Sequence, residues 1–259
     1  MHRAHAVIDP VRPTSACELV VEQLRRAIHL GRFLAGDKLP PERELAKQLG
    51  VSRTTVRDAV KILEGDGLVR SKRGAAGGLT VLERDAGAVR KSLAGGLRAI
   101  EAIYDYRLAI ECAAAKLASA RRSKSDLTAL ARHVKRMGEL AALRSEADPA
   151  QVLAAVSQFM AVDSEFHLGI ARAARNDYLL TAIEDARAAM FLPIGAVFNR
   201  LEDNANAYHE AIFAALEAGD AAAAEQAMAA HLRASRGGVE GLMQHGFAAE
   251  QHGAAGEPG

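Results

Sequence analysis

From about Glu83 to its carboxyl end, the sequence shows the periodicity of α-helices only. Apolar residues, mostly alanine and leucine, recur at steps of three and four and therefore share one face of each helix. Short polar or glycine-containing breaks divide this part into six or seven helices, at Gly95, Ser123, Ala147, Arg175, Glu202 and Gly219. Because no alternating strand pattern interrupts these helices, we expect an all-α helical bundle over residues 99–245.

The first 81 residues have a different pattern. A helix begins after Thr14 or Ser15 and carries apolar residues at Leu19, Leu24 and Ile28. The stretch LAGDKLPPERELAKQLGVSRTTVRDAVKILEGDGLVRSKRGAAGGLTV then predicts a turn, a helix, a tight turn, a second helix, a strand, a glycine-rich loop and a strand.

These patterns predict a mainly α protein with a small α/β domain at its amino end. We expect a flexible arm over residues 1–15, a winged helix-turn-helix with a small β wing over 16–81, and a linker over 82–98. The helical bundle over 99–245 follows, and a disordered tail over 246–259 ends the chain.

Neither a membrane protein nor a disulfide-bonded one fits this sequence. The longest apolar runs, such as FLPIGAVF from Phe191, fall short of the ~20 residues that span a bilayer, and the amino end lacks the apolar core of a secretion signal. Cys17 and Cys112 lie 95 positions apart with no CxxC spacing. With 259 residues, 49% of them hydrophobic, the chain can bury a real core, so we expect a cytoplasmic protein with no membrane contact.

The net charge of +1 conceals an uneven distribution. Residues 1–80 hold 14 Lys and Arg against 9 Asp and Glu, whereas the remainder holds 19 against 23. A basic first part joined to a mildly acidic body indicates a polyanionic partner for the first part, although an ordinary solvated surface also explains it.

Between Glu42 and Lys61, the residue sizes suit a helix-turn-helix. Ala46 is small enough for the two helices to cross closely, Gly50 suits the turn, and the packed apolar set is Leu45, Leu49, Val51, Val56 and Val60. The polar residues left at the exposed start of the second helix are Ser52, Arg53, Thr54, Thr55 and Arg57. Arginine can reach both acceptors of a guanine, and hydroxyls can hold phosphates or base edges. This predicts a DNA-reading helix, with a plain helical hairpin as the alternative.

The segment LPPERELAKQLGVSRTTVRDAVKILEGDGLV and the basic, glycine-rich stretch after it resemble the winged helix of GntR-family bacterial transcription regulators. In that family the helices contribute major-groove and phosphate contacts, and the wing tip reaches the minor groove. The resemblance implies DNA contacts from Arg43, Ser52, Arg53, Thr54, Thr55 and Arg57, and from Arg73 and Gly74 in the wing. The wing, KRGAAGGLTV, is looser than the commoner GxGTFV of the family.

The stretch FMAVDSEFHLGI, from Phe159 to Ile170, places Asp163 and His167 four residues apart in an apolar helix stripe. The stripe has helical spacing throughout, with Val152, Val156, Met160, Asp163, His167, Ile170 and Ala174. A carboxylate and an imidazole that face a core are costly unless they bond to each other, meet a buried partner or hold a metal. On this pair alone, a hydrogen-bonded core pair and a metal site both stay open.

The remaining histidines form two groups. His209 and His231 point inward from their apolar stripes, whereas six lie in the chain ends, near a helix end or beside a stripe and are expected at the surface: His2, His5, His29, His133, His245 and His252.

His209 and His231 lie on two helices joined by the AGD turn, where Gly219 ends the first helix and Asp220 caps the second. His209 lies ten residues before Gly219 and His231 eleven after Asp220, so in an antiparallel hairpin both are about 15–16 Å from the turn. Three imidazoles and one carboxylate form a set that binds Zn²⁺, Ni²⁺, Fe²⁺ or Mn²⁺. A buried polar cluster without metal is the alternative.

The part from about Ile100 to Leu242 resembles the FCD effector domain of the FadR subfamily within the GntR family. The resemblance is carried by YRLAIE, DSEFHLGIA, YHEAIFAALEAGD and MAAHLRAS. In that domain an aspartate and three histidines hold a divalent metal, which implies the ligands Asp163, His167, His209 and His231 here. Members of the subfamily that bind fatty acyl-CoA lack this metal set, so the resemblance favours a small-molecule effector.

Arg107 interrupts a further apolar stripe, which runs Ile100, Ile103, Arg107, Ile110, Ala114 and Leu117. A buried guanidinium needs an anion. The spacing alone fits a pair with Glu111 equally well. The resemblance places an arginine for the effector carboxylate at this point, and an arginine beside an open metal forms a carboxylate clamp.

Together these features predict a homodimeric, metabolite-responsive regulator of transcription, a repressor of a catabolic operon, and no enzyme. The winged-helix domains of two copies of the chain would bind the half-sites of a short palindromic operator, because one winged helix makes too few contacts for specificity. A small carboxylate at the metal would control DNA affinity. The alternatives are a purely structural metal and a metal-dependent hydrolase. The hydrolase is disfavoured because the chain has no HExxH and no other inward acid or base at motif spacing from the four ligands. A ferritin-like di-iron site is disfavoured because the chain has no Glu-x-x-His.

Overall fold

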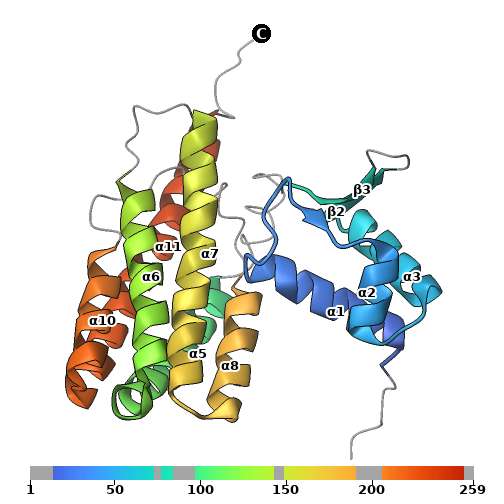
Figure 1. Ribbon diagram of the computed structural model, residues 1–259. Coiled ribbons are helices and arrows are strands. Elements are labelled where there is room, and N and C mark those ends of the chain that lie inside the picture. Colours follow the sequence, from blue (N-terminus) through green and yellow to red (C-terminus); the bar gives the residue numbers. More distant parts are fainter. Residues whose placement is uncertain (1–13, 73–76, 84–96, 143–148, 191–205, 254–259) are drawn as a thin grey trace, which may run out of the picture. The chain divides into compact units, whose positions relative to one another are not determined.

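The computed structural model describes residues 14–72, 77–83, 97–142, 149–190 and 206–253 (Figure 1). The chain divides into two compact units. One comprises residues 1–26 and 35–82, and the other comprises residues 27–34 and 83–259. Among the described helices, none is both long enough and apolar enough to span a bilayer.

The first unit, called the head below, is a winged helix-turn-helix, as predicted. Its elements are α1 (Ala16–His29), β1 (Lys38–Leu39), α2 (Glu42–Leu49), α3 (Arg53–Gly65), β2 (Val69–Lys72) and β3 (Gly78–Val81). The strands form an antiparallel sheet in the order β1-β3-β2, in which Lys38 pairs with Thr80 and Val69 with Val81. The loop that joins β2 to β3 includes Arg73 and Gly74, which lie outside the described residues.

The turn between α2 and α3 forms as the residue types require. Gly50 has a left-handed backbone (φ 67°) and its N–H bonds to the carbonyl of Ala46, while the Ser52 side chain accepts from the N–H of Thr55 and caps α3. The predicted core residues Leu45, Val56 and Val60 are buried, and Leu49 and Val51 are half-buried. Ala59 and Leu63, which the sequence reasoning did not include, are fully buried.

Helix α1 differs from the expectation at both ends. Leu19 is 56% exposed, contrary to the prediction, whereas Leu24 and Ile28 are buried as predicted and are joined in the core by Val20 and Val21. The segment from Ala27 to Leu34 belongs to the second unit, although the sequence placed it in the winged-helix domain. Within the second unit, a Cβ on Gly31 (φ 72°) would lie 2.7 Å from the Cβ of Ala161, so a larger residue would collide there.

His29 belongs to this same segment and is not the surface residue that we expected. Its ring is half-buried, and Nδ1 lies 3.2 Å from the carbonyl oxygen of Ala188. Its position near a helix end therefore did not indicate exposure, because the turn after α1 packs into the helical core through Leu30.

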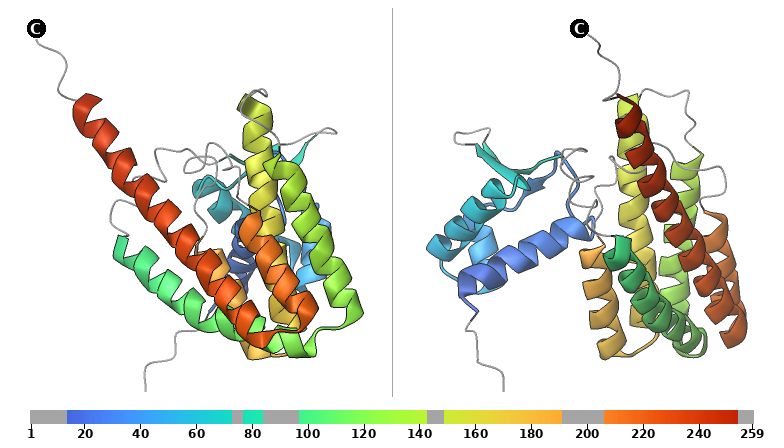
Figure 2. Two further views of the ribbon diagram at one scale, coloured as in Figure 1. Left: turned by 90° about the vertical axis from the view of Figure 1, so that its left-hand side faces the viewer. Right: turned by 180° about the vertical axis from the view of Figure 1, so that it is seen from behind.

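The second unit, called the helical unit below, is the all-α bundle that the periodicity predicts. Its described helices are α5 (Leu97–Arg121), α6 (Lys124–Ala141), α7 (Pro149–Ala173), α8 (Asp177–Ala189), α10 (Ala207–Ala218) and α11 (Ala221–Gly253). Helix α5 packs against α7, α8, α10 and α11, while α6 packs against α7 and α10 (Figures 1 and 2). The core between them holds large buried residues such as Leu130, Met137, Phe166, Leu168 and Ile170.

Two predicted boundaries of this unit shift. Helix α5 begins at Leu97, so the last two residues of the expected linker are helical. Helix α11 continues to Gly253, and the tail expected from residue 246 is therefore wrong for residues 246–253. The alanine-rich sequence FAAEQ has high helix propensity, and a single glycine costs only about 1 kcal/mol in a helix interior. The other parts of the arm, linker and tail lie largely outside the described residues.

Candidate functional site

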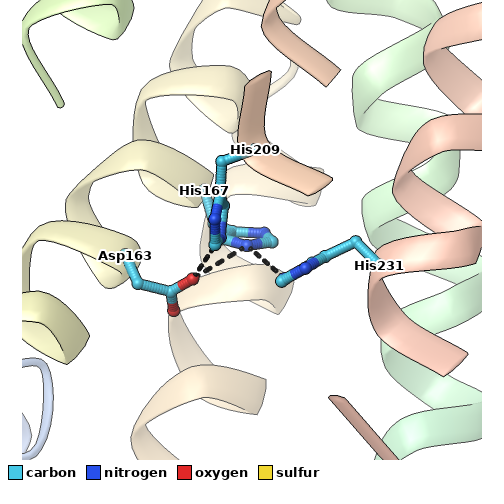
Figure 3. Close-up of side chains that lie close together, drawn as sticks. All are labelled: Asp163, His167, His209 and His231. Atoms are coloured by element: carbon cyan, nitrogen blue, oxygen red, sulfur yellow. Dashed lines mark hydrogen bonds and ion pairs between the residues drawn. The ribbon is translucent and has the colours of Figure 1, made fainter. Parts of the chain in front are cut away.

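Four side chains from three helices converge in the core of the helical unit (Figure 3). Asp163 and His167 come from α7, His209 from α10 and His231 from α11, and none is more than 9% exposed. One ligand atom from each lies within 4.8 Å of the others. His209 Nε2 is 2.8 Å from Asp163 Oδ1, and the Nε2 atoms of His167 and His231 are 3.2 Å apart. The four residues that the sequence predicts as metal ligands therefore lie together.

The hairpin of α10 and α11 is what brings His209 and His231 level. Gly219 ends α10 in a left-handed conformation (φ 74°), and Asp220 Oδ1 accepts from the N–H groups of Ala222 and Ala223 at the start of α11. The centroids of the two rings are 4.5 Å apart, and the ring planes are tilted by 56° to each other. Local capping residues thus set the relative height of two ligands.

The protonation of the cluster suits a cation. His167 Nδ1 donates to the carboxylate of Glu111 on α5, which leaves Nε2 on the side of the ring that faces His231 and Asp163. Burial, together with the neighbouring rings of His167 and His209, lowers the pKa of His231 well below its usual value and keeps it neutral. Burial alone would raise the pKa of Asp163, but Arg187 and His167 hold it well below its usual value.

Neutral imidazoles and an ionised carboxylate are the forms that bind a divalent metal. Two ring nitrogens that approach each other closely inside an apolar shell are also better satisfied by a shared cation than by each other. Phe159 and Phe166 provide that shell, in T-shaped contacts with His209 whose ring centroids are 5.9 and 5.5 Å apart. The residues present therefore fit a metal ion held by the four predicted ligands.

Arg107 is 4% exposed and belongs to the same buried cluster. Its Nε donates to Glu111, which confirms the pairing that the spacing alone allowed, and its Nη1 lies 3.0 Å from the sulfur of Met190. Burial alone would raise the pKa of Glu111, but Arg107 and His167 outweigh it and hold that pKa below its usual value. Glu111 thus connects Arg107 to the ligand His167.

The sequence reasoning missed a second buried guanidinium, that of Arg187 on α8. Arg187 Nη2 donates to Asp163 and also to Ser164 Oγ at 3.2 Å, and Nη1 lies 3.9 Å from Glu111 Oε2. Its signal was present, because Arg187 follows Leu180 and Ile183 and precedes Met190 at helical spacing. That is the same interruption of an apolar stripe by arginine that identified Arg107.

In the head, the residues expected to contact DNA lie at the surface around the start of α3. Arg43, Ser52, Arg53, Thr54 and Arg57 are exposed and Thr55 is half-buried. Arg57 is held near Glu42, with Nη2 and Oε2 3.3 Å apart, an exposed pair that contributes little stability and can open. The face combines guanidiniums, hydroxyls and a helix amino terminus, all of which suit a phosphate backbone and base edges.

Two protein families match this chain. The family described as "Bacterial regulatory proteins, gntR family" matches residues 17–77, and the family described as "FCD domain" matches residues 102–234. The chain is 32% identical over 241 residues to the "Putative L-lactate dehydrogenase operon regulatory protein" of Escherichia coli K12, covering 86% of this chain and 85% of that one.

Two further comparisons agree. The chain is 29% identical over 217 residues to the "HTH-type transcriptional regulator LutR" of Bacillus subtilis, with 78% of this chain and 91% of that one covered. Its fold is similar to the solved structure titled "E. coli McbR/YncC", with a TM-score of 0.54 and 21% identity over 90% of this chain and 99% of that one.

Proposed function

The chain belongs to the GntR family of bacterial regulatory proteins and carries an FCD domain, and on this basis we propose that it is a repressor controlled by a small carboxylate. The family and the relatives are transcription regulators, so the chain is a DNA-binding regulator and the hydrolase that its ligand set alone would allow is set aside. The proposal concerns the metal, the effector, the dimer and the direction of control.

The observation that carries the effector proposal is the buried set of Asp163, His167, His209 and His231 beside Arg107. When bound there, Zn²⁺, Ni²⁺, Mn²⁺ or Fe²⁺ would offer open coordination positions to a carboxylate. Arg107 would pair with the same anion, because a guanidinium binds a carboxylate strongly in a desolvated site. One relative is named for an operon of L-lactate dehydrogenase, whose substrate is a small hydroxycarboxylate.

We further propose that two copies of the chain bind a short palindromic operator. Each head would place α3 in the major groove of one half-site, with Arg43, Ser52, Arg53, Thr54, Thr55 and Arg57 at the DNA, and the wing residues Arg73 and Gly74 in the minor groove. Sedimentation of the purified chain tests the dimer, and a monomeric mass at micromolar concentration would contradict it.

The effector proposal is tested by calorimetry of the metal-loaded full chain with small hydroxycarboxylates such as lactate and glycolate. We expect binding that a chelator abolishes and that Arg107→Ala weakens by about 10- to 100-fold, as for a lost charge-assisted hydrogen bond. Acid binding that survives metal removal would make the metal structural. Tight binding of an uncharged sugar or an acyl-CoA, indifferent to chelator, would overturn the proposal.

Whether the protein represses or activates transcription is tested on a genomic DNA fragment that the protein selects in vitro. For a repressor released by its effector, the same acid should weaken binding to that fragment and raise transcription from it. Transcription that requires both the protein and the acid would instead make the chain an activator, as one relative, the "Glc operon transcriptional activator" of Escherichia coli K12, is named.

A further inference from the structure

Arg187 has donors that the protein does not use. The side chain is 9% exposed, and only its Nη2 donates, to Asp163 and Ser164. Among the described residues, the buried Nε and Nη1 have no hydrogen-bond partner, and Nη1 has only a distant ion pair with Glu111 at 3.9 Å. A buried guanidinium with idle N–H groups is costly, so a missing acceptor is expected at this position.

The charges of the cluster lead to the same conclusion. Asp163 is paired with the buried guanidinium of Arg187, and Glu111 is paired with that of Arg107, so the charges of these two ion pairs already balance. Imidazoles that bind a metal are neutral and add no charge. A divalent ion in this buried site would therefore leave two positive charges uncompensated, which is strongly unfavourable away from water.

We propose that the effector is a dianion, a small dicarboxylate, and that Arg187 binds its second carboxylate. This inference rests on the proposed function, since the first carboxylate is the one that the bound metal ion and Arg107 would receive. Arg187 approaches the cluster from α8, whereas Arg107 approaches it from α5, so the two guanidiniums can hold different ends of one short molecule. A second carboxylate would give Nε and Nη1 their acceptor and would neutralise the bound ion.

Matched acids test the proposal on the metal-loaded full chain. L-malate and L-lactate share a 2-hydroxycarboxylate group and differ by one carboxylate, and tartronate and glycolate form a second such pair. By calorimetry, we expect each dicarboxylate to bind about 10- to 100-fold more tightly than its partner, the effect of a buried charge-assisted bond. Metal content is measured after each titration, because dicarboxylates can also extract metal.

The variant Arg187→Gln should remove this preference, so that L-malate and L-lactate bind to it with similar affinities. Arg172→Gln is the matched control, since Arg172 is an exposed arginine of α7 that pairs with Glu165 at 3.2 Å. If Arg187→Gln loses metal, Arg187→Lys takes its place. Lysine keeps the positive charge but has a compact ammonium group in place of the planar guanidinium. The Arg187→Lys variant should therefore retain a reduced preference for the dicarboxylate.

The outcomes distinguish this inference from the proposed function. Equal or tighter binding of the monocarboxylates, still abolished by chelator, would overturn the dianion and leave the proposed function intact. A dicarboxylate preference that persists unchanged in both Arg187 variants would overturn the role of Arg187. If no acid of either kind binds the metal-loaded protein, the proposed function itself fails.

Discussion

Single arginine residues occupy opposite settings in the two units. Arg53 at the start of α3 is exposed, whereas Arg107 and Arg187 are buried among carboxylates and imidazoles. An exposed guanidinium is hydrated and ready to exchange water for phosphate or guanine, so removing it affects a partner rather than the fold. A buried guanidinium is part of a balanced charge cluster, so removing it disturbs its neighbours too.

For the head, we expect Arg53→Ala and Arg57→Ala to weaken operator binding while the protein stays folded. A guanine-reading arginine is worth about 1–3 kcal/mol at one base step, whereas a lost phosphate contact weakens binding to all sequences alike. Gel-shift titration against the operator and its single-base variants separates the two cases. Arg136→Ala, which removes an exposed charge from α6, should have no effect. Unchanged affinity in both head variants would remove the DNA-binding role assigned to them.

For the helical unit, we expect about one divalent ion per chain and its loss in His209→Ala and His231→Ala. The melting temperature should fall, because the remaining ligands are left close together without their cation. His133→Ala is the control, since His133 lies on α6, outside the cluster. Metal analysis of protein purified without an affinity tag decides the matter: a stable, metal-free wild type would show that the four residues form a polar core.

At the scale of elements, the hairpin of α10 and α11 depends on Gly219. Its left-handed backbone (φ 74°) is unfavourable for other residues, and an added Cβ would lie 3.0 Å from Arg122 Nη2. We expect Gly219→Ala to lower the free energy of unfolding by about 1–2 kcal/mol. Because this turn sets the height of His209 against His231, the variant should also bind metal less tightly.

Gly237 is the control for that substitution. It lies exposed inside α11, with nothing within 4 Å of an added Cβ. Gly237→Ala should therefore raise the free energy of unfolding by about 0.4–1 kcal/mol, through a lower entropy of the unfolded chain. Chemical denaturation of both variants measures the contrast, and equal effects of the two substitutions would show that the turn conformation of Gly219 is unimportant.

At the scale of the whole molecule, regulation requires that acid and DNA influence each other's binding. If the acid changes DNA affinity by some factor, DNA must change acid affinity by the same factor, and we expect it to lie between about 5 and 150. Calorimetry of the acid with and without operator DNA, set beside gel shifts with and without acid, tests this equality. The Arg107→Ala variant should still bind DNA, but the acid should no longer change its DNA affinity. A factor of about 1 in both experiments would mean that the acid does not control DNA binding.

The sequence by itself determined the elements and the identity of the four converging side chains, because both depend on short-range signals. Helical spacing assigned Asp163 and His167 to one face, and Gly219 and Asp220 defined the turn that levels His209 with His231. Gly50 and Ser52 defined the turn and the cap of the head in the same way.

Only the tertiary structure decided which partners these residues meet. The spacing of the sequence did not decide whether Arg107 pairs with Glu111 or with an effector. The packing of α5 against α7 and α8 shows that Glu111 bonds to both Arg107 and His167. The packing of α8 against α7 brings Arg187 to Asp163, and the segment after α1 places Gly31 against Ala161 of α7. Contacts between helices depend on their crossing and relative height, which the pattern along a single helix does not encode.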